Sequence, residues 1–392
     1  MTNTYICSYS RTPIGSFQGT LSKISATELG SYVIKSVINK SDINQNLIDE
    51  VIMGNVLSAN LGQAPARQAS IGAGLSNKTE CLTINKVCGS GLKAIMLADQ
   101  SIKLKSSDLI VAGGMESMSL APHYLSKHRK GLMFGHDKII DSILKDGLWD
   151  PYNDCAMGSC GEILSKEKKY TIEMQNEFAI KSYEKSIDAI ELGNFKDEIV
   201  GIEVENKKNK FIFNTDEEPL KFNKDKLKQL KPAFKKNGTI TAGNASSLSD
   251  GAAAVLLCSD SFKENNNVKP IAKILGHTSY ATDPLYFTKA PIYAIEKLTK
   301  SLNFDIDKID LFEINEAFSC VVMAAIDELK IDSNKVNVNG GAVSMGHPIG
   351  ASGARILVTL LNALKLRKLK YGIATLCIGG GEASAVLVEM CS

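Results

Sequence analysis

The sequence predicts an α/β fold built from two similar halves, with a segment of different composition inserted between them. Three observations support this prediction: strand-like runs alternate with helix-like runs, one set of motifs occurs twice, and the middle of the chain resembles neither copy. Such alternation is typical of α/β domains. The chain has 392 residues, 44% of them hydrophobic, which is enough apolar material for a large core.

Strand-like and helix-like runs follow one another towards both ends of the chain. Helical spacing of apolar residues occupies 26–40 and 91–104, and apolar runs that indicate buried strands occupy 108–114, 252–258 and 371–378. Glycine-rich turns separate the two kinds of run, as expected where the chain reverses between a sheet and the helices that cover it.

The middle of the chain has more charge, more lysine and asparagine, and fewer strand-like runs. We interpret it as an inserted loop-and-helix region in which 171–195 forms an amphipathic helix. The predicted domains are therefore a first half of 1–118 with 250–270, an inserted domain of 119–249, and a second half of 271–392.

An internal repeat relates the two halves. Matching runs recur at an offset of 261 to 267 residues: 48–55 with 309–316, 90–102 with 352–364, and the glycines at Gly113 with those near Gly380. Two similar halves that face each other create a cleft at their interface, where ligand sites usually lie.

Charge and cysteine content restrict the classes of partner and compartment. The net charge of +2 gives no long-range field for nucleic acid, and we expect no membrane span because no run is long and apolar enough. The basic runs 208–214 and 221–236 suit either a solvated face or an anionic ligand. The nine cysteines form no CxxC pair, which argues against zinc and disulfides, and the N-terminus lacks a targeting signal. We expect a cytoplasmic protein.

Four residues on glycine-rich or strand-end loops are candidates for chemistry: Cys88, His347, Cys377 and Asn315. Cys88 precedes a predicted helix, whose unpaired N–H groups favour a thiolate, and Cys377 precedes glycines whose N–H groups suit an oxyanion. Each residue alone also fits a structural role, as a turn corner, a hydrogen-bonded histidine, a buried thiol or a cap. If the halves pack about a pseudo-twofold axis, the loops of Cys88 and His347 meet.

Two cysteines and one histidine fit carbon–carbon bond chemistry on a thioester. Cys88 would take an acyl group as a thioester after His347 removes its proton. Cys377 would move a proton to or from the carbon next to a second thioester, a step that also needs donors for the enolate oxygen. Asn315 and His347 would supply those donors. A hydrolase needs no second proton-shuttling thiol.

The order of motifs resembles the thiolase family, in its short-chain acetoacetyl-CoA thiolase group, along essentially the full chain. The motifs that carry the resemblance are RTPIGSFQGTLS, GNVLSANLGQAPARQAS, NKVCGSGLKA, AGGMESMS, TAGNASSLSDGAAA, NEAFS, NGGAVSMGHPIGASGARI and CIGGGEASA. This resemblance implies a duplicated thiolase fold with a layered αβαβα core. It also implies acetyl-CoA C-acetyltransferase activity, the reversible condensation of two acetyl-CoA into acetoacetyl-CoA and coenzyme A.

By this resemblance, Cys88 is the acylated nucleophile, His347 activates it and Cys377 is the acid and base at carbon. Asn315 holds a water that forms one oxyanion hole with His347. The backbone N–H groups of Cys88 and Gly379 form the other. The resemblance implies no tightly bound cofactor, with acetyl-CoA, acetoacetyl-CoA and coenzyme A as partners and a homotetramer, a dimer of dimers, as the assembly.

The resemblance further assigns coenzyme A to the inserted domain. The matching positions are Leu148, Met157, Lys221, Phe234, Ala242 and Ser246, with Ala317 and Phe318 along the tunnel. Phe287 stands where short-chain members close the acyl pocket with a bulky residue. Ala156 departs from the family, because many relatives have histidine there, which affects coenzyme A binding rather than the chemistry. Some relatives hold a potassium ion, and Tyr183 and Val343 match residue types of that site.

Three rival interpretations remain open on the residues alone. A β-ketoacyl synthase-like enzyme would use two histidines, or histidine and asparagine, in place of Cys377. A thiolase of β-oxidation with a broader chain-length range would accept long 3-ketoacyl-CoA, which Phe287 disfavours. A non-catalytic thiolase-like binding subunit would lack acyl transfer. The physiological direction does not follow from the sequence, because an enzyme lowers both barriers alike.

Overall fold

The computed structural model describes residues 2–205 and 209–391. Its first half alternates strands and helices as predicted. The elements are β1 (Thr4–Arg11), α1 (Ala26–Ser41), β3 (Glu50–Gly54), α2 (Pro65–Gly72), β4 (Glu80–Ile84), α3 (Ser90–Lys103), β5 (Leu109–Ser117) and, after the inserted segment, β12 (Ser249–Ser259).

The second half consists of β13 (Ala272–Ala281), α8 (Ala290–Leu302), β14 (Leu311–Ile314), α9 (Ser319–Leu329), α10 (Ala342–Met345), α11 (Ile349–Arg367), β15 (Tyr371–Ile378) and β16 (Glu382–Met390). It follows a similar order of elements to the first half, except that a short helix, α10, stands where the first half has strand β4. The helix and strand that follow Cys88 in the first half, α3 and β5, have counterparts in α11 and β15, which follow His347. This correspondence confirms the duplicated α/β fold.

The strands of both halves form one long sheet in the order β14-β15-β16-β13-β1-β12-β5-β3-β4, with β2 (Gly15–Ser16) attached to β12. The halves join where β1 pairs with β13 over three positions, from Thr4–Ile274 to Ile6–Ala272. Outwards from this junction, β1, β12, β5 and β3 of the first half correspond to β13, β16, β15 and β14 of the second, and β4 is an additional edge strand of the first half. The chain duplication is therefore visible in the strand order itself.

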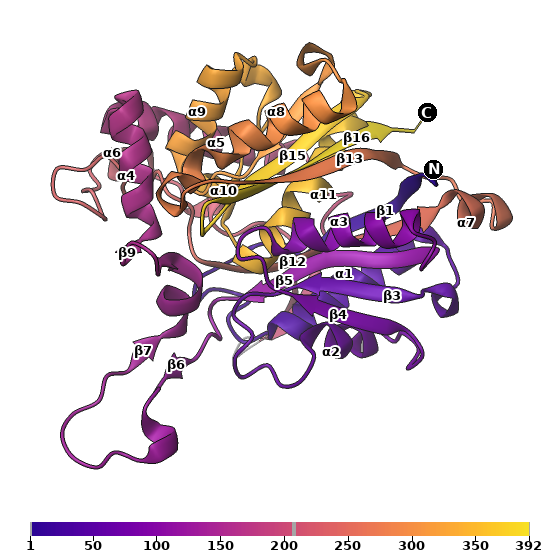
Figure 1. Ribbon diagram of the computed structural model, residues 1–392, viewed down its shortest axis with the longest axis horizontal. Helices are drawn as coiled ribbons and strands as arrows, with labels where there is room; N and C mark the ends of the chain where they lie inside the picture. The colour runs from indigo at the N-terminus through magenta and orange to yellow at the C-terminus, as the bar shows by residue number, and fades with distance from the viewer. Residues whose placement is uncertain (1, 206–208, 392) are drawn as a thin grey trace.

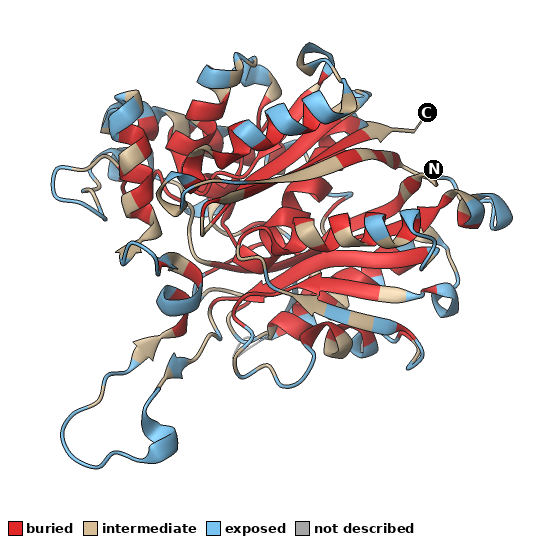
Figure 2. Ribbon diagram, in the orientation of Figure 1, coloured by how far each residue is buried: buried red, intermediate tan, exposed pale blue. Residues whose placement is uncertain are grey.

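Five layers build the molecule, as Figure 1 shows. Helices α1 and α2 cover one outer face, α8 and α9 cover the other, and α3 and α11 lie between the two halves of the sheet. Figure 2 shows that the inner strands β5 and β12 and the central helix α11 are buried almost throughout, whereas the edge strand β4 is not. This arrangement matches the expected αβαβα core and places the N-terminal ends of α3 and α11 inside the molecule.

The two central helices approach each other closely through glycine. A Cβ atom on Gly91 would lie 2.8 Å from the backbone nitrogen of Ala354, and one on Gly353 would lie 2.4 Å from that of Leu92. Side chains at these positions would force the helices apart. The SG pairs at the start of each repeat thus serve helix packing, which brings the loops before the two helices together.

Helix α11 corrects one expectation from the sequence. Its 19 residues are long and apolar enough to cross a membrane by length and composition, although none of the runs was expected to be. In the structure, however, 89% of its most apolar window is buried inside the protein. The apolar composition is explained by its place between two sheet halves, which cover it from both sides.

The inserted segment contains α4 (Met157–Lys168), α5 (Ile172–Glu191), α6 (Lys224–Lys228) and three short strand pairs. Helix α5, capped by Thr171, confirms the amphipathic helix predicted for 171–195. A buried ion-pair cluster fixes the segment to β1, where Arg11 contacts Glu198 at 2.6 Å and Asp216 at 2.7 Å. Lys208, the first residue of one predicted basic run, lies outside the described residues.

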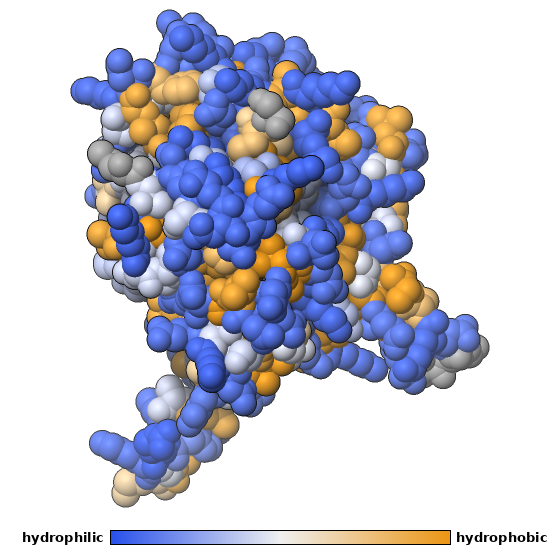
Figure 3. Space-filling view, turned by 90° about the vertical axis from the view of Figure 1, so that its right-hand side faces the viewer, coloured by the Kyte–Doolittle hydropathy of each residue, from blue (hydrophilic) through white to orange (hydrophobic). Residues whose placement is uncertain are grey.

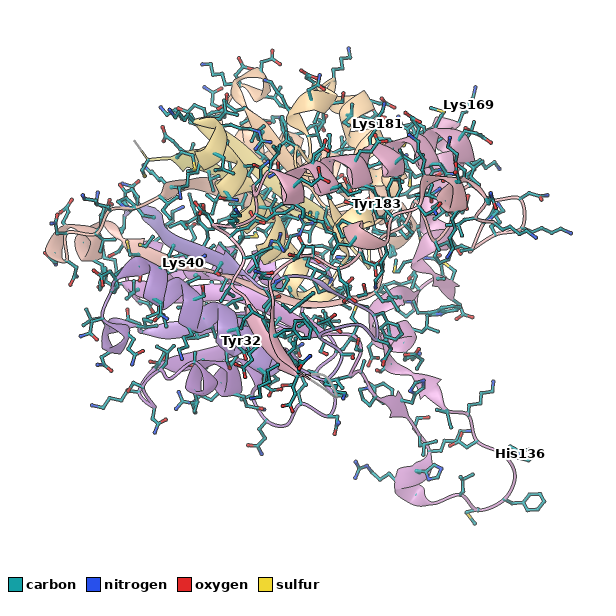
Figure 4. All side chains as sticks on the ribbon, turned by 180° about the vertical axis from the view of Figure 1, so that it is seen from behind. Tyr32, Lys40, His136, Lys169, Lys181 and Tyr183 are labelled. Atoms are coloured by element: carbon teal, nitrogen blue, oxygen red, sulfur yellow. The ribbon has the colours of Figure 1, made fainter. Side chains whose placement is uncertain are left out.

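One arm of the inserted segment projects from the body, between β6 (His123–Tyr124) and β7 (Ile140–Asp141). His136 lies near its far end in Figure 4. The arm carries Met133 and Phe134, which are almost completely exposed. Figure 3 shows hydrophobic and hydrophilic residues side by side on this lower projection.

Candidate active site

The loop before α3 holds Cys88 in a strained turn. Val87 has a φ of 47°, a left-handed conformation that is rare for a β-branched residue. The Asn85 side chain accepts a hydrogen bond from the Val87 N–H at 2.9 Å, and the Ser90 hydroxyl donates to the Val87 carbonyl at 2.7 Å. Such strain costs about 1–3 kcal/mol and is characteristic of functional sites. These bonds fix Cys88 at the N-terminal end of α3.

The thiol of Cys88 lies in a buried environment that also contains Gly379. Its sulfur accepts hydrogen bonds from its own N–H and from that of Gly379, and both bonds lower the pKa. Burial is the larger effect and raises the pKa of Cys88 to about 11, with a further increase from the charge of Glu116. At neutral pH the residue is therefore a thiol, and it needs a base before it can act as a nucleophile.

His347 is buried and has its ring orientation set by Ser352. The Ser352 hydroxyl donates its hydrogen to the Pro348 carbonyl at 3.0 Å, so it accepts from His347 Nδ1 at 2.5 Å. The proton of the neutral ring is therefore on Nδ1. The opposite nitrogen, Nε2, is buried without a partner among the described residues. Burial and then the charge of Arg355 lower the pKa of His347 to about 3, so Nε2 is a free base at neutral pH.

Cys377 ends β15 and lies close to Cys88. Burial raises its pKa well above 9, and the nearby sulfurs of Cys88 and Cys320 raise it further. Asn315 follows β14, which runs parallel to β15, and its N–H donates to the Thr375 carbonyl at 3.0 Å. The strand ends of the second half thus hold Cys377 and Asn315 next to the nucleophile loop of the first half.

A cavity of about 360 Å³ leads to this group and contains His347 in its wall. Six of the residues assigned to the substrate from sequence line it: Leu148, Met157, Phe234, Ala242, Ser246 and Phe318. Met157 also reaches the loop that binds the Cys88 sulfur, because a Cβ on Gly379 would lie 3.4 Å from its Sδ. The cavity therefore connects the inserted segment to the candidate catalytic residues.

The other assigned positions lie outside the cavity lining. The Ala317 carbonyl accepts from the Ser246 N–H at 3.1 Å, so Ala317 is directly behind the wall. Phe287 is buried in the same apolar cluster as Cys377. Lys221 pairs with Glu217 and Glu218 at 3.4 and 3.5 Å and does not line the cavity. Ala156, where many relatives have histidine, does line it.

Two buried charged residues at the site were missed from sequence. Glu116 accepts from the N–H groups of Val56, Leu57 and Gly350, and so ties β5 to the first turn of α11. Arg355 extends from α11 towards Asn315. Both lie within the motifs AGGMESMS and GASGARI, and a charged side chain in an otherwise apolar run was the signal that could have identified them.

Replacing His347 by asparagine is expected to slow alkylation of Cys88 by iodoacetamide about 100-fold at neutral pH, because the base is lost. The rate in the variant should then rise about tenfold per pH unit towards the pKa of Cys88, about 11, as the thiolate fraction grows. Intact mass against time measures the rate. His136→Asn, on the projecting arm, is the control, and equal pH profiles in variant and wild type would contradict the assignment.

Comparison with protein families decides the ancestry of the chain. The thiolase N-terminal domain matches residues 4–261, and the thiolase C-terminal domain matches residues 268–390. The chain belongs to the thiolase family. As a thiolase it is 51% identical to acetyl-CoA acetyltransferase 2 of Arabidopsis thaliana, over 98% of this chain and 96% of that relative. It is 46% identical to an acetyl-CoA acetyltransferase of Pseudomonas aeruginosa, over 98% of this chain and 99% of that relative.

Solved thiolase structures agree with this membership. The crystal structure of the Bacillus anthracis acetyl-CoA acetyltransferase matches with a TM-score of 0.97 and 38% identity, covering 100% of this chain and 99% of that one. The Acat5 thiolase from Ascaris suum, solved in complex with coenzyme A, matches with a TM-score of 0.94 and 43% identity, over 99% and 100%. This thiolase therefore keeps the family fold without large insertions or deletions.

Proposed function

We propose that this thiolase is an acetyl-CoA C-acetyltransferase, which converts two acetyl-CoA reversibly into acetoacetyl-CoA and coenzyme A through an acetyl thioester on Cys88. The observation that carries the proposal is the close packing of the Cys88 loop against the loop of the second thiol, Cys377. A Cβ atom on Gly89 would lie 2.3 Å from Ile378 Cδ1, and one on Gly379 would lie 3.6 Å from Val87 Cγ1. Relatives of this name share about half of the residues over nearly the full chain, which supports the same reaction.

In the first half-reaction, His347 Nε2 accepts the Cys88 proton, and the sulfur attacks the thioester carbonyl of acetyl-CoA. In the resting enzyme, the N–H groups of Cys88 and Gly379 face the sulfur. During the attack they donate hydrogen bonds to the carbonyl oxygen of the substrate as this oxygen becomes negative. The C–S bond to coenzyme A breaks, and the leaving thiolate takes the proton of Cys377. The enzyme then holds an acetyl-Cys88, an imidazolium and a Cys377 thiolate.

In the second half-reaction, the Cys377 thiolate removes a proton from the methyl carbon of a second acetyl-CoA. An acetylated Cys88 cannot become a thiolate, so it no longer opposes the negative charge that Cys377 carries in this step. The His347 imidazolium and a water held by Asn315 donate to the enolate oxygen. The enolate carbon bonds to the acetyl carbon, the bond to Cys88 breaks, and His347 returns its proton to that sulfur. Kinetics should be ping-pong.

Thiolysis of acetoacetyl-CoA by free coenzyme A tests the proposal directly. The expected result is turnover with acetoacetyl-CoA well above that with a long-chain 3-ketoacyl-CoA. Comparable rates would favour the alternative of a broader-chain thiolase of β-oxidation. Absence of both turnover and Cys88 acetylation would favour the alternative of a non-catalytic thiolase-like binding subunit.

Replacing Phe287 by alanine is expected to raise kcat/KM for a six-carbon 3-ketoacyl-CoA relative to acetoacetyl-CoA by about tenfold. The smaller side chain leaves room for the longer acyl chain, and burying an extra methylene in an apolar pocket changes kcat/KM by at least about this factor. The aromatic ring is 3% exposed and packs in the cluster that contains Cys377. Competition between the two substrates measures the ratio. Phe304→Ala is the control, because that ring packs on Tyr371 at the opposite end of β15 from Cys377. An unchanged ratio in the Phe287 variant would remove Phe287 from the acyl pocket.

The remaining assignments support this function without being required by it. We propose that the inserted segment binds coenzyme A, with the lysines of 221–236 near its phosphates, and that the exposed arm carrying Met133 and Phe134 joins four copies into a tetramer. Tyr183, on α5 in Figure 4, packs in one cluster with Val343, which suits a potassium site built from backbone carbonyls around that cluster. The cytoplasmic location stays a prediction.

A further inference from the structure

Arg355 is buried in the middle of the molecule, with 2% of its surface exposed, on the apolar helix α11. Its Nη1 donates to Glu313 Oε1 at 2.9 Å, and its Nη2 donates to Asn315 Oδ1 at 3.4 Å. Its Nε has no partner among the described residues. Burying a guanidinium costs several kcal/mol, and a buried ion pair seldom adds net stability over apolar residues. Stability alone therefore does not explain an arginine at this position.

The contact with Asn315 decides which way its side-chain amide faces. An asparagine amide can rotate by half a turn with little change in shape, but an arginine only donates hydrogen bonds. Arg355 therefore requires the amide oxygen on its own side and leaves Nδ2 directed away from it. Asn315 is fully buried, and Nδ2 has no partner among the described residues. Leaving a buried donor without a hydrogen bond costs about 1–3 kcal/mol, so a ligand or a water is expected to accept the hydrogen bond of Asn315 Nδ2.

The same guanidinium acts on His347 by its charge. Burial is the larger cause of the low pKa of His347, and Arg355, on the helix that follows this residue, is the charged group that lowers it further. The other titratable side chains of the site are the thiols Cys88 and Cys377 and the buried carboxyls Glu116 and Glu313. His347 Nε2 is the second buried atom of the site without a partner among the described residues. Arg355 thus acts on both Asn315 and His347, whose Nδ2 and Nε2 atoms have no hydrogen-bond partner among the described residues.

We propose that Arg355 is the positioning residue of the second half-reaction, which orients the Asn315 amide so that Nδ2 faces the enolate oxygen or the water that binds it. Its charge also lowers the pKa of His347, which is a supporting effect smaller than that of burial. The inference rests on the proposed function, because the enolate belongs to that reaction. Glu313 has a supporting role, because its carboxyl accepts a hydrogen bond from one arm of the guanidinium at 2.9 Å. Burial raises the pKa of this carboxyl to about 8, so its protonation changes near neutral pH. Arg355 itself touches no reacting atom.

Three variants separate orientation from charge. Arg355→Lys keeps the charge but loses the two guanidinium nitrogens that contact Glu313 and Asn315 at the same time. Arg355→Met removes both the charge and these nitrogens. Because that change leaves Glu313 buried without its partner, Arg355→Met with Glu313→Gln is the folded comparison. Arg367→Met, further along α11 and paired to Asn339, is the matched control for loss of an arginine from this helix.

The expected loss in kcat for condensation is about 100-fold in Arg355→Met with Glu313→Gln, with KM for acetyl-CoA changed less than about threefold, as for loss of one oxyanion donor. In this double variant the acid limb of the pH–kcat/KM profile should move up, because His347 then titrates closer to its ordinary pKa. Arg355→Lys should lower kcat for condensation but leave the acid limb of the pH–kcat/KM profile where it is in the wild type. Arg367→Met should match wild type in both.

A substrate-independent readout distinguishes failure of this inference from failure of the proposed function. The pH profile of Cys88 alkylation should move up in the double variant even if acetyl-CoA is not the substrate, since it reports only His347. Wild-type turnover of acetoacetyl-CoA tests the proposed function separately. If the folded double variant keeps wild-type kcat, pH limb and alkylation profile, Arg355 has only a structural role and the inference is wrong.

Discussion

Replacing Cys88 by alanine is expected to lower turnover of acetoacetyl-CoA with coenzyme A by at least about 10⁴-fold, the loss typical of removing a covalent nucleophile. The fold should be retained, because alanine removes one sulfur from a turn whose hydrogen bonds come from Asn85 and Ser90. Incubation of wild type with acetyl-CoA should add the mass of one acetyl group to the intact protein. The variant should gain none.

Cys81→Ala is the matched control, because Cys81 is another free thiol and lies on the edge strand β4. It should acetylate and turn over like wild type. Peptide mapping should place the acetyl group on Cys88 in the wild type. Acetylation that persists in the Cys88 variant, or that maps to another cysteine, would contradict the covalent mechanism, whichever substrate proves best.

Much of the fold was predictable because the repeat constrains it. Once IDEVIMGN and IDLFEINE are aligned, the strands β3 and β14 and the helices after them occupy equivalent places, and the loops before α3 and α11 must approach the same axis. The buried strand β12 followed from its continuous apolar run. The junction between β1 and β13 had no sequence signal, since three paired positions depend on how the halves dock.

The polar residues that organise the site were less predictable. Arg355 lies in a helix whose apolar composition indicated only that the helix is buried. That the same helix is long and apolar enough to cross a membrane was not recognised from the sequence. Glu313, the partner of Arg355, is 42 positions away in the chain, so no local spacing reveals the pair. Lys221 was assigned near the nucleotide from a loose alignment. It pairs with Glu217 and Glu218 outside the cavity lining, and its place at coenzyme A stays a prediction.

The two thiols of the site differ in role because their surroundings differ. Cys88 has two N–H donors on its sulfur and so is stabilised as a thiolate when its proton leaves. Cys377 is fully buried among apolar residues, receives its own N–H alone, and has its pKa raised by Cys88. The first environment suits a group that must carry negative charge and attack. The second suits a group that holds a proton strongly and exchanges it with carbon.

Replacing Cys377 by alanine is therefore expected to leave acetylation of Cys88 detectable while lowering condensation by about 10³-fold, within the range for loss of a general acid–base. Exchange of the acetyl-CoA methyl protons with deuterated water, followed by mass spectrometry, should fall equally, because no other described thiol is placed to remove them. Cys320→Ala is the matched control, since Cys320 is equally buried beside Cys377 and bonds the Gly161 carbonyl instead. Rapid methyl exchange in the Cys377 variant would assign the proton transfer to His347 and leave the second thiol without a catalytic role.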